Sequence, residues 1–174
     1  MSLSKTVDIS GGILVGHDGS RFSDQGLEWA LDYAEKLSVP VTVMRAWVMT
    51  TAPTPKTKEF GYIPPASDYA DATRDALAAD IAGHLERHPD VSVSCQAVHG
   101  AAAEALVEAS ERADLLVVGP RGRGGFKGLT LGSVSSKLVS HAQCPTVIVR
   151  GGSDDPTPAA DFVLDENLES ASDA

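Results

Sequence analysis

The chain has 174 residues, 43% of them hydrophobic, and a formal net charge of −10; this length suits one domain with a substantial core. No apolar run approaches the roughly 18 residues that span a bilayer, and the N-terminal segment MSLSKTVDIS lacks the apolar core of a signal peptide. We therefore expect a cytoplasmic protein without a membrane segment, and the low aromatic content of 5% and the lack of a basic face argue against a nucleic-acid partner.

The first predicted unit is a strand followed by a helix. The apolar residues 13–15 predict the strand, and the sequence GHDGS at residues 16–20 predicts the loop after it. Ser23 and Asp24 are residue types that cap helices. The helix is predicted from there to about residue 37, because apolar side chains recur at helical spacing: Leu27, Ala30, Leu31, Ala34 and Leu37.

The second predicted unit contains a long connection. Residues 41–48 predict a strand, and residues 50–67 contain four prolines and predict a loop. A loop of this length is uncommon in a compact domain unless it is functional or mobile. Ser67 is predicted to cap the next helix, whose apolar face consists of Ala70, Leu77, Ile81 and Leu85.

The alternation of strands and helices continues to residue 149. Residues 91–97 alternate apolar and polar side chains, as in a strand with one buried face, and residues 101–112 predict a short helix. A continuous apolar strand is predicted at 115–118, a helix at 132–142 and a last strand at 146–149. The helix at 132–142 aligns three apolar residues on one face: Val134, Leu138 and Ala142.

This alternation predicts an α/β fold. Its expected form is an open, doubly wound, five-stranded parallel sheet of Rossmann-like or flavodoxin-like order, with helices on both faces. Ligands of such sheets bind beyond the carboxyl ends of the strands, where the winding reverses. If the first and fourth strands are neighbours, the loops that follow them line one crevice.

The loop after the fourth strand carries the strongest functional signal. Gly119, Gly122, Gly132 and Ser133 have the spacing G-x2-G-x9-G-[ST]. Glycine lets phosphate oxygens approach backbone N–H groups, and the free amides of a helix start attract anions. The pattern predicts phosphate binding, and a flexible surface loop is the alternative. The chain has no Walker A sequence, and its first β–α turn lacks the GxGxxG fingerprint of dinucleotide-binding folds.

Asp18, in the loop after the first strand, is the candidate partner of this glycine loop. A carboxylate suits a ribose hydroxyl or a divalent cation, whereas a turn aspartate followed by Gly19 is the alternative. His17 has no nucleophile at a fixed spacing, so we predict no catalytic residue. Three cations can neutralise phosphate charge or remain solvated in the loop: Arg121, Arg123 and Lys127.

Three segments together resemble the universal stress protein family, in its ATP-binding branch. The segments are ILVGHDGS, VHGAAAEALVEAS and VVGPRGRGGFKGLTLGSVSSKLVSHAQCPTVIVR, and the last fits the family's G-x2-G-x9-G-[ST] pattern at every fixed position. The resemblance covers about residues 9–150, so residues 1–150 are the expected family domain. It implies the strand order 3-2-1-4-5, as in adenine nucleotide alpha hydrolase-like folds, with ATP across the switch point.

The resemblance also implies the ligand contacts. Asp18 would bind the ribose, Gly16 and His17 would approach the adenine through the backbone, and Ala46 would touch the adenine. The residues implied along the ribose and phosphate path are Val118, Gly119 and Gly122. Those implied to hold the phosphates at the helix start are Gly132, Ser133, Val134 and Ser135. A divalent cation, Mg²⁺ or Mn²⁺, is expected on the phosphates.

The function expected from these features is a cytoplasmic, ATP-binding regulator of the stress response with an unidentified protein partner. One alternative is a slow ATPase in which Asp18 and a divalent cation position water, and another is an interaction module without nucleotide. A nucleotide-dependent switch is favoured over turnover, because hydrolysis needs a water-positioning group and none is evident.

The two features near the end of the chain concern association. Residues 146–149 would form an exposed apolar sheet edge, which needs pairing or covering, and the resemblance implies a homodimer that pairs Thr146–Val149 with its copy. Residues 153–174 contain seven acids and neither Lys nor Arg. We therefore predict that residues 151–174 are an acidic, disordered tail.

Overall fold

The computed structural model describes residues 4–123 and 130–151, which form one parallel sheet and four helices. The strands are β1 (Ile13–Gly16), β2 (Val41–Trp47), β3 (Val93–His99), β4 (Leu115–Val118) and β5 (Thr146–Ile148). The helices are α1 (Arg21–Leu37), α2 (Ala66–Arg87), α3 (Ala102–Ser110) and α4 (Ser133–His141). The strand order is β3-β2-β1-β4-β5 with every pair parallel, which confirms the predicted order 3-2-1-4-5.

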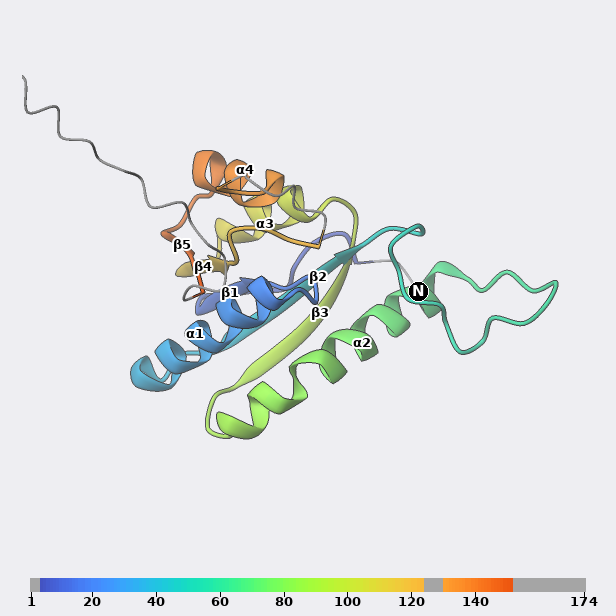
Figure 1. The fold of residues 1–174 in the computed structure, drawn as a ribbon, viewed down its shortest axis with the longest axis horizontal. Coiled ribbons are helices and arrows are strands. Elements are labelled where there is room, and N and C mark those ends of the chain that lie inside the picture. The colour runs from blue at the N-terminus through green and yellow to red at the C-terminus, as the bar shows by residue number, and fades with distance from the viewer. Residues whose placement is uncertain (1–3, 124–129, 152–174) are drawn as a thin grey trace, which may run out of the picture.

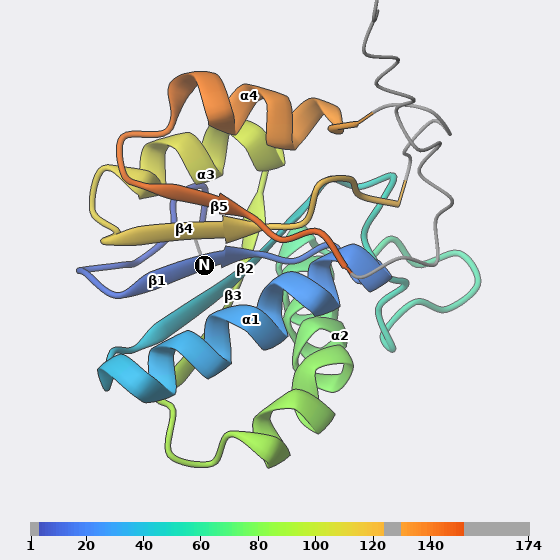
Figure 2. The same cartoon turned by 60° about the vertical axis from the view of Figure 1, so that its left-hand side comes forward.

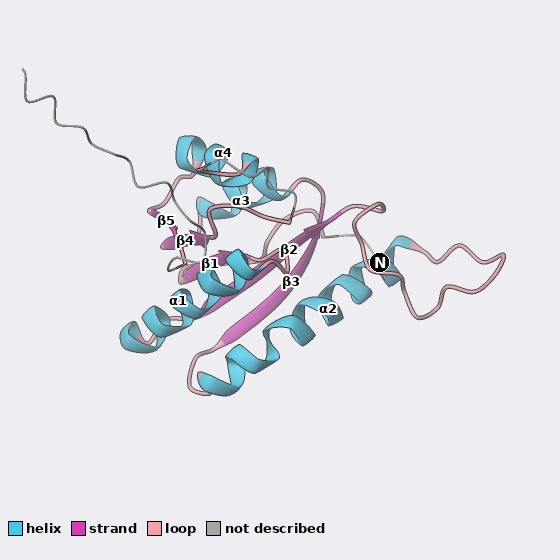
Figure 3. Ribbon diagram, in the orientation of Figure 1, coloured by secondary structure: helices cyan, strands magenta, loops and turns pink. Residues whose placement is uncertain are grey.

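The sheet is the middle of three layers. Helices α1 and α2 cover one face, and α3 and α4 cover the other (Figures 1 and 2). Because all strand pairs are parallel, the carboxyl ends of the strands share one edge of the sheet (Figure 3). None of the helices within residues 4–123 and 130–151 combines the length and apolar character needed to cross a membrane.

The central position of β1 follows from its residues. Leu14 and Val15 are both 0% exposed, and they belong to different cores: Leu14 packs on the α3–α4 side and Val15 on the α1–α2 side. A parallel strand buried on both faces reads as a continuous apolar run. The same reason explains the apolar sequence LLVV of β4, which pairs with β1.

The start of α1 differs from the prediction. Its N-cap is Ser20, not Ser23 or Asp24, and the helix begins at Arg21. Ser20 accepts a hydrogen bond from the Ser23 N–H while the Ser23 hydroxyl bonds back to Ser20, which forms a capping box. Asp24 is thereby free to face His17 instead. Leu37, predicted on the buried face, is 53% exposed because the helix ends there at the left-handed Ser38.

Other elements also begin or end a few residues away from the predicted positions. Helix α2 begins at Ala66 behind Pro65, and Ser67, the predicted cap, lies in its first turn. Strand β3 begins at Val93 because Val91 closes a turn onto the His88 carbonyl, and it extends to His99. Four elements are shorter than predicted by one to three residues in total: α3, β2, β5 and α4.

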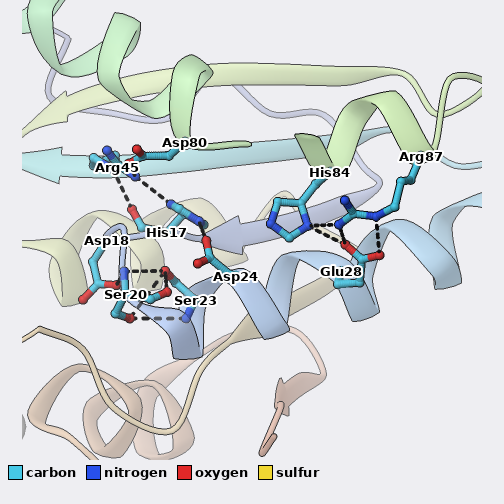
Figure 4. A network of polar contacts seen from close by, with 10 residues as sticks. All are labelled: His17, Asp18, Ser20, Ser23, Asp24, Glu28, Arg45, Asp80, His84 and Arg87. Carbon is cyan, nitrogen blue, oxygen red and sulfur yellow. Dashed lines mark hydrogen bonds and ion pairs between the residues drawn. The ribbon is translucent and has the colours of Figure 1, made fainter. Parts of the chain in front are cut away.

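An ionic cluster joins α1 to α2 (Figure 4). Arg87 donates to both carboxylate oxygens of Glu28, from Nη2 at 2.6 Å and from Nε at 3.2 Å, and His84 Nδ1 contacts the same carboxylate. The Arg87 hydrogen bonds lower the pKa of Glu28 to about 2, against the opposing effect of burial and with help from His84.

Replacing Glu28 with glutamine is expected to lower the melting temperature at neutral pH but not in strong acid. The pKa of Glu28 is lowered from 4.5 to about 2 on folding, so its stabilising contribution is present above pH 4.5 and is lost as the pH falls through 2. Thermal melts of both chains across this range measure the effect. A melting difference that stays constant with pH would contradict it.

Candidate functional site

A cavity of about 580 Å³ opens at the carboxyl edge of the sheet, where β1 and β4 are neighbours and the winding reverses. The structure brings ten of the eleven predicted site residues to its wall: Gly16, His17, Asp18, Ala46, Val118, Gly119, Gly122, Gly132, Ser133 and Val134. Cavities of this size, at this place in a doubly wound sheet, commonly hold small-molecule ligands.

Asp18 joins the β1 turn to the glycine loop. One carboxylate oxygen accepts from the Ser20 N–H at 3.0 Å, and the other accepts from the Arg123 N–H at 2.8 Å. Burial raises the pKa of Asp18, but the hydrogen bonds from Ser20, Arg123 and Ser23 outweigh burial and lower the pKa below its ordinary value. The side chain is therefore an anion at neutral pH. Gly19 has a φ of +80°, so Asp18 is also a turn aspartate followed by a glycine in the left-handed region, as the alternative prediction stated.

The glycines of the loop pack where side chains would not fit. A Cβ on Gly119 would lie 2.7 Å from the Phe22 carbonyl oxygen, and one on Gly122 would collide with the Asp18 carboxylate. The loop returns to α4 through a hydrogen bond of 2.7 Å from the Gly132 N–H to the Pro120 carbonyl. These contacts hold the described parts of the loop against the β1 turn.

Helix α4 presents its first turn to the cavity. Its N-cap, Gly132, supplies no side-chain cap, so the first amides of the helix receive none of the usual capping. Ser133 and Val134 line the cavity. Ser135 is the predicted site residue that does not: it is buried, and its hydroxyl donates to the Gly119 carbonyl at 2.8 Å. Ser135 thus supports the loop from behind, and its predicted contact with phosphate stays a prediction.

His17 is buried at the centre of a polar network (Figure 4). Arg45 Nη2 donates to His17 Nδ1 at 2.7 Å, so Nε2 carries the proton and donates to Asp24 at 2.9 Å. Arg45 also pairs with Asp80 of α2 at 2.7 Å. Burial lowers the pKa of His17, although its hydrogen bond to Asp24 acts in the opposite direction. The backbone N–H and C=O of His17 bond to Met44 and Arg45, so its implied backbone contact with adenine stays a prediction.

Sequence reasoning missed one wall of this cavity. It is formed by the end of β2, the segment after it and α2: Arg45, Trp47, Thr51, Pro53, Thr73, Ala76 and Asp80. One signal could have found it, because Arg45 is a single charged residue inside the otherwise uncharged strand VTVMRAW. Thr73 and Asp80 of α2 gave no signal, since a polar residue on a helix is usually solvated.

The structure describes two of the three predicted loop cations. Arg121 and Arg123 line the cavity, and the Arg121 guanidinium lies 5.0 Å from the centre of the Phe22 ring. Lys127 lies outside the described residues, as does the predicted tail from residue 152 onward.

The model of the universal stress protein family matches residues 11–150. A universal stress protein of Mycolicibacterium smegmatis is 35% identical over 142 residues, which covers 79% of this chain and 45% of the relative. The chain thus spans a little under half the length of that relative.

Two solved structures share the fold. A universal stress protein in complex with cAMP has a TM-score of 0.59 at 24% identity, covering 82% of this chain and 98% of that one. A universal stress protein family member of Arabidopsis thaliana with AMP bound has a TM-score of 0.54 at 16% identity, covering 86% of this chain and 97% of that one. At these identities the likeness concerns the fold.

Proposed function

Because this chain belongs to the universal stress protein family, we propose that it is a cytoplasmic, ATP-binding regulator of the stress response that works as a homodimer. The cavity is the proposed nucleotide site. In it, the glycine loop and the first turn of α4 bind the phosphates, Asp18 binds the ribose, and the end of β2 with Ala46 contacts the adenine. The adenine nucleotides bound by the two structural relatives are in line with this assignment.

One observation carries the proposal: the hydrogen bond of 2.8 Å from the Arg123 N–H to Asp18. It joins the carboxylate after β1, which is proposed to bind the ribose, to the glycine loop after β4, which is proposed to bind the phosphates. The bond crosses the point where the winding of the sheet reverses. A sugar and its phosphate, which are covalently neighbours, need these two groups side by side.

The proposed ATP would carry a divalent cation on its phosphates. Within residues 4–123 and 130–151 no three metal-ligating side chains cluster, so the cation would take its oxygens mainly from phosphates, as Mg²⁺ often does. The cation would offset the negative charge that the phosphates bring near the Asp18 carboxylate.

The test of nucleotide binding is direct. The purified chain is denatured and any released ligand is identified by mass spectrometry, and the stripped protein is then titrated with ATP, ADP and AMP. We expect an adenine nucleotide with micromolar or tighter affinity. If no nucleotide is released and none of the three binds, the proposal is wrong.

A turnover assay separates the regulator from the slow ATPase. Hydrolysis needs a residue that positions the attacking water, and Asp18 is proposed to bind the ribose instead. We expect ATP to be retained unhydrolysed over hours. Phosphate release that disappears in Asp18→Ala would establish the ATPase instead.

Proline at Thr146 is expected to convert the proposed homodimer to a monomer. The Val149 N–H donates to β4, so the Thr146 and Ile148 N–H groups, which alternate with it, point to the outer edge of β5. Proline removes one of these donors and is tolerated on edge strands. Sedimentation equilibrium should give twice the 18.1 kDa of the chain for the parent and a single copy for the variant. A dimer that survives the substitution would place the interface elsewhere.

A further inference from the structure

Two side chains at the end of β2 carry hydrogen-bond donors that the described residues leave unused. Arg45 and Trp47 are two residues apart, so they lie on the same face of the strand, and both line the cavity. Arg45 is 8% exposed and Trp47 is 2% exposed. Buried donors nearly always have an acceptor, and a lone one indicates a bound water or ligand.

The indole of Trp47 is held in place by its neighbours. Its ring stacks on Tyr69 of α2, with centroids 6.5 Å apart, and makes a T-shaped contact with the His99 ring, with centroids 4.7 Å apart. The Nε1–H group finds no acceptor among the described residues, although it is buried. A ligand atom that accepts this hydrogen bond would remove the cost of the unpaired donor.

The guanidinium of Arg45 is also fixed, but only on one side. Nε donates to the His17 carbonyl at 3.3 Å, Nη2 donates to His17 Nδ1 at 2.7 Å, and Nη2 also forms an ion pair with Asp80 at 2.7 Å. Nη1 makes no hydrogen bond to the described residues and is not one of their fully buried unpaired atoms, so it is open to a ligand or to water. Asp80 offsets the charge of Arg45, so this wall suits a neutral acceptor better than a second anion.

His17 is the group that orients Arg45. It accepts at Nδ1 from Arg45 only while that nitrogen is unprotonated, and its Nε2–H is anchored on Asp24 at 2.9 Å. A protonated imidazole has donors at both nitrogens and would face the guanidinium with a donor and a like charge.

The order of strands decides which part of a nucleotide meets this wall. Along the carboxyl edge, β2 carries Arg45 and Trp47, β1 leads to Asp18, and β4 leads to the glycine loop. Phosphate, sugar and base follow one another in a nucleotide. With phosphate over β4 and sugar at Asp18, the base lies over β2.

We propose that Arg45 and Trp47 are specificity-determining residues that donate hydrogen bonds to acceptor atoms of the nucleobase, and that neutral His17 is the residue that positions Arg45. This inference rests on the proposed nucleotide binding. Asp80, beside Arg45, is available to accept from an amino group next to the base acceptor, as adenine offers.

The first experiment measures adenosine and AMP binding by calorimetry in variants of the full chain. Arg45→Met keeps the stem and removes the donors, Trp47→Phe removes the indole N–H, and Arg74→Met is the matched control on the exposed face of α2. Because each lost bond to a fixed donor is worth about threefold to tenfold or more, we expect both site variants to weaken both ligands by at least that factor. Arg74→Met should leave both affinities unchanged.

Each other outcome has a separate meaning. Parent affinity in Arg45→Met and Trp47→Phe would overturn the inference while leaving the proposed function intact. A loss for AMP without a loss for adenosine would assign the contact to a phosphoryl oxygen and overturn the base assignment. If the parent chain binds neither ligand, the proposed function fails first.

The second experiment tests the positioning role through pH. Adenosine is the ligand, because the phosphate of AMP itself titrates near pH about 6. The charged groups that face His17 or its partner Arg45 are Asp24 from α1, Asp18 from the β1 turn, Arg45 from β2, Asp80 from α2 and Arg123 from the glycine loop. Burial lowers the pKa of His17 from 6.5, so the neutral form prevails at pH 6.5 and protonation follows as the pH falls further.

Adenosine affinity of the parent is therefore expected to decrease as the pH falls below 6.5, and that of His17→Gln is expected to stay constant over the same range. Glutamine offers an acceptor and a donor but does not titrate in this range. Circular dichroism at each pH establishes that both chains remain folded. Identical pH profiles of the two chains would overturn the positioning role of His17.

Discussion

Replacing Gly122 with glutamate is expected to abolish nucleotide binding while the protein remains folded. Any Cβ at this position collides with the Asp18 carboxylate, and the glutamate adds a second negative charge where phosphate is expected. We expect at least about a 100-fold loss of affinity for ATP and AMP, or about 2.7 kcal/mol. The residue lies in an exposed part of the loop, so its change should leave the core unaffected.

Gly83→Glu is the matched control for this variant. It adds the same side chain in α2, where a Cβ meets nothing within 4 Å. Glycine is unfavourable inside a helix by about 1 kcal/mol, so the control should melt at the same temperature or higher and bind like the parent. Calorimetric titration and thermal melts measure both properties. Parent affinity in Gly122→Glu would show that the ligand lies elsewhere.

Replacing Asp18 with alanine is expected to weaken nucleotide binding by about tenfold to 100-fold. The variant loses the proposed contact to the ribose and also two bonds that order the site, from the Ser20 and Arg123 amides. Bonds to a charged group are worth about 1.5 to 3 kcal/mol each. Asp18→Asn keeps one acceptor oxygen, and its loss should be intermediate.

A cycle with a modified ligand isolates the ribose contact from the loop contact. The parent and Asp18→Ala chains are each titrated with AMP and with its 2′,3′-dideoxy analogue. If Asp18 binds the sugar hydroxyls, the parent prefers AMP and the alanine variant does not discriminate. If the variant discriminates as well as the parent, Asp18 orders the loop without touching the ribose.

The fold was largely predictable because it depends on regular patterns. The apolar runs of β1 and β4 reflect burial on both faces, and strict alternation with helices leaves few parallel topologies. Helix starts were less predictable. Ser20, Ser23 and Asp24 are all capping types within five positions, and only the packed structure selects Ser20 as the cap and assigns Asp24 to His17.

The candidate site was predictable where it depends on spacing along the chain. The glycine pattern and Asp18 were identified, and ten of the eleven site residues line the cavity. The exception is Ser135, which follows the cavity-lining residue Val134 in α4. The helical rotation from one residue to the next directs the Ser135 hydroxyl to the Gly119 carbonyl instead of the cavity. Arg45 was missed because its role depends on His17 and Asp80, which are 28 and 35 positions away in the sequence.

By itself, the sequence determined the β–α alternation, the carboxyl-edge loops and the residue types that can accept a phosphate and a ribose. Each of these follows from short-range periodicity or from the conformational freedom of glycine. The tertiary structure alone decided which of these groups meet. Asp18 bonds to Arg123, 105 positions later in the chain, and Arg45 lies between His17 and Asp80, because parallel pairing brings the ends of β2, β1 and β4 to one edge. Contacts between residues so far apart in the chain arise from strand order and packing, so they cannot be predicted from short-range sequence patterns.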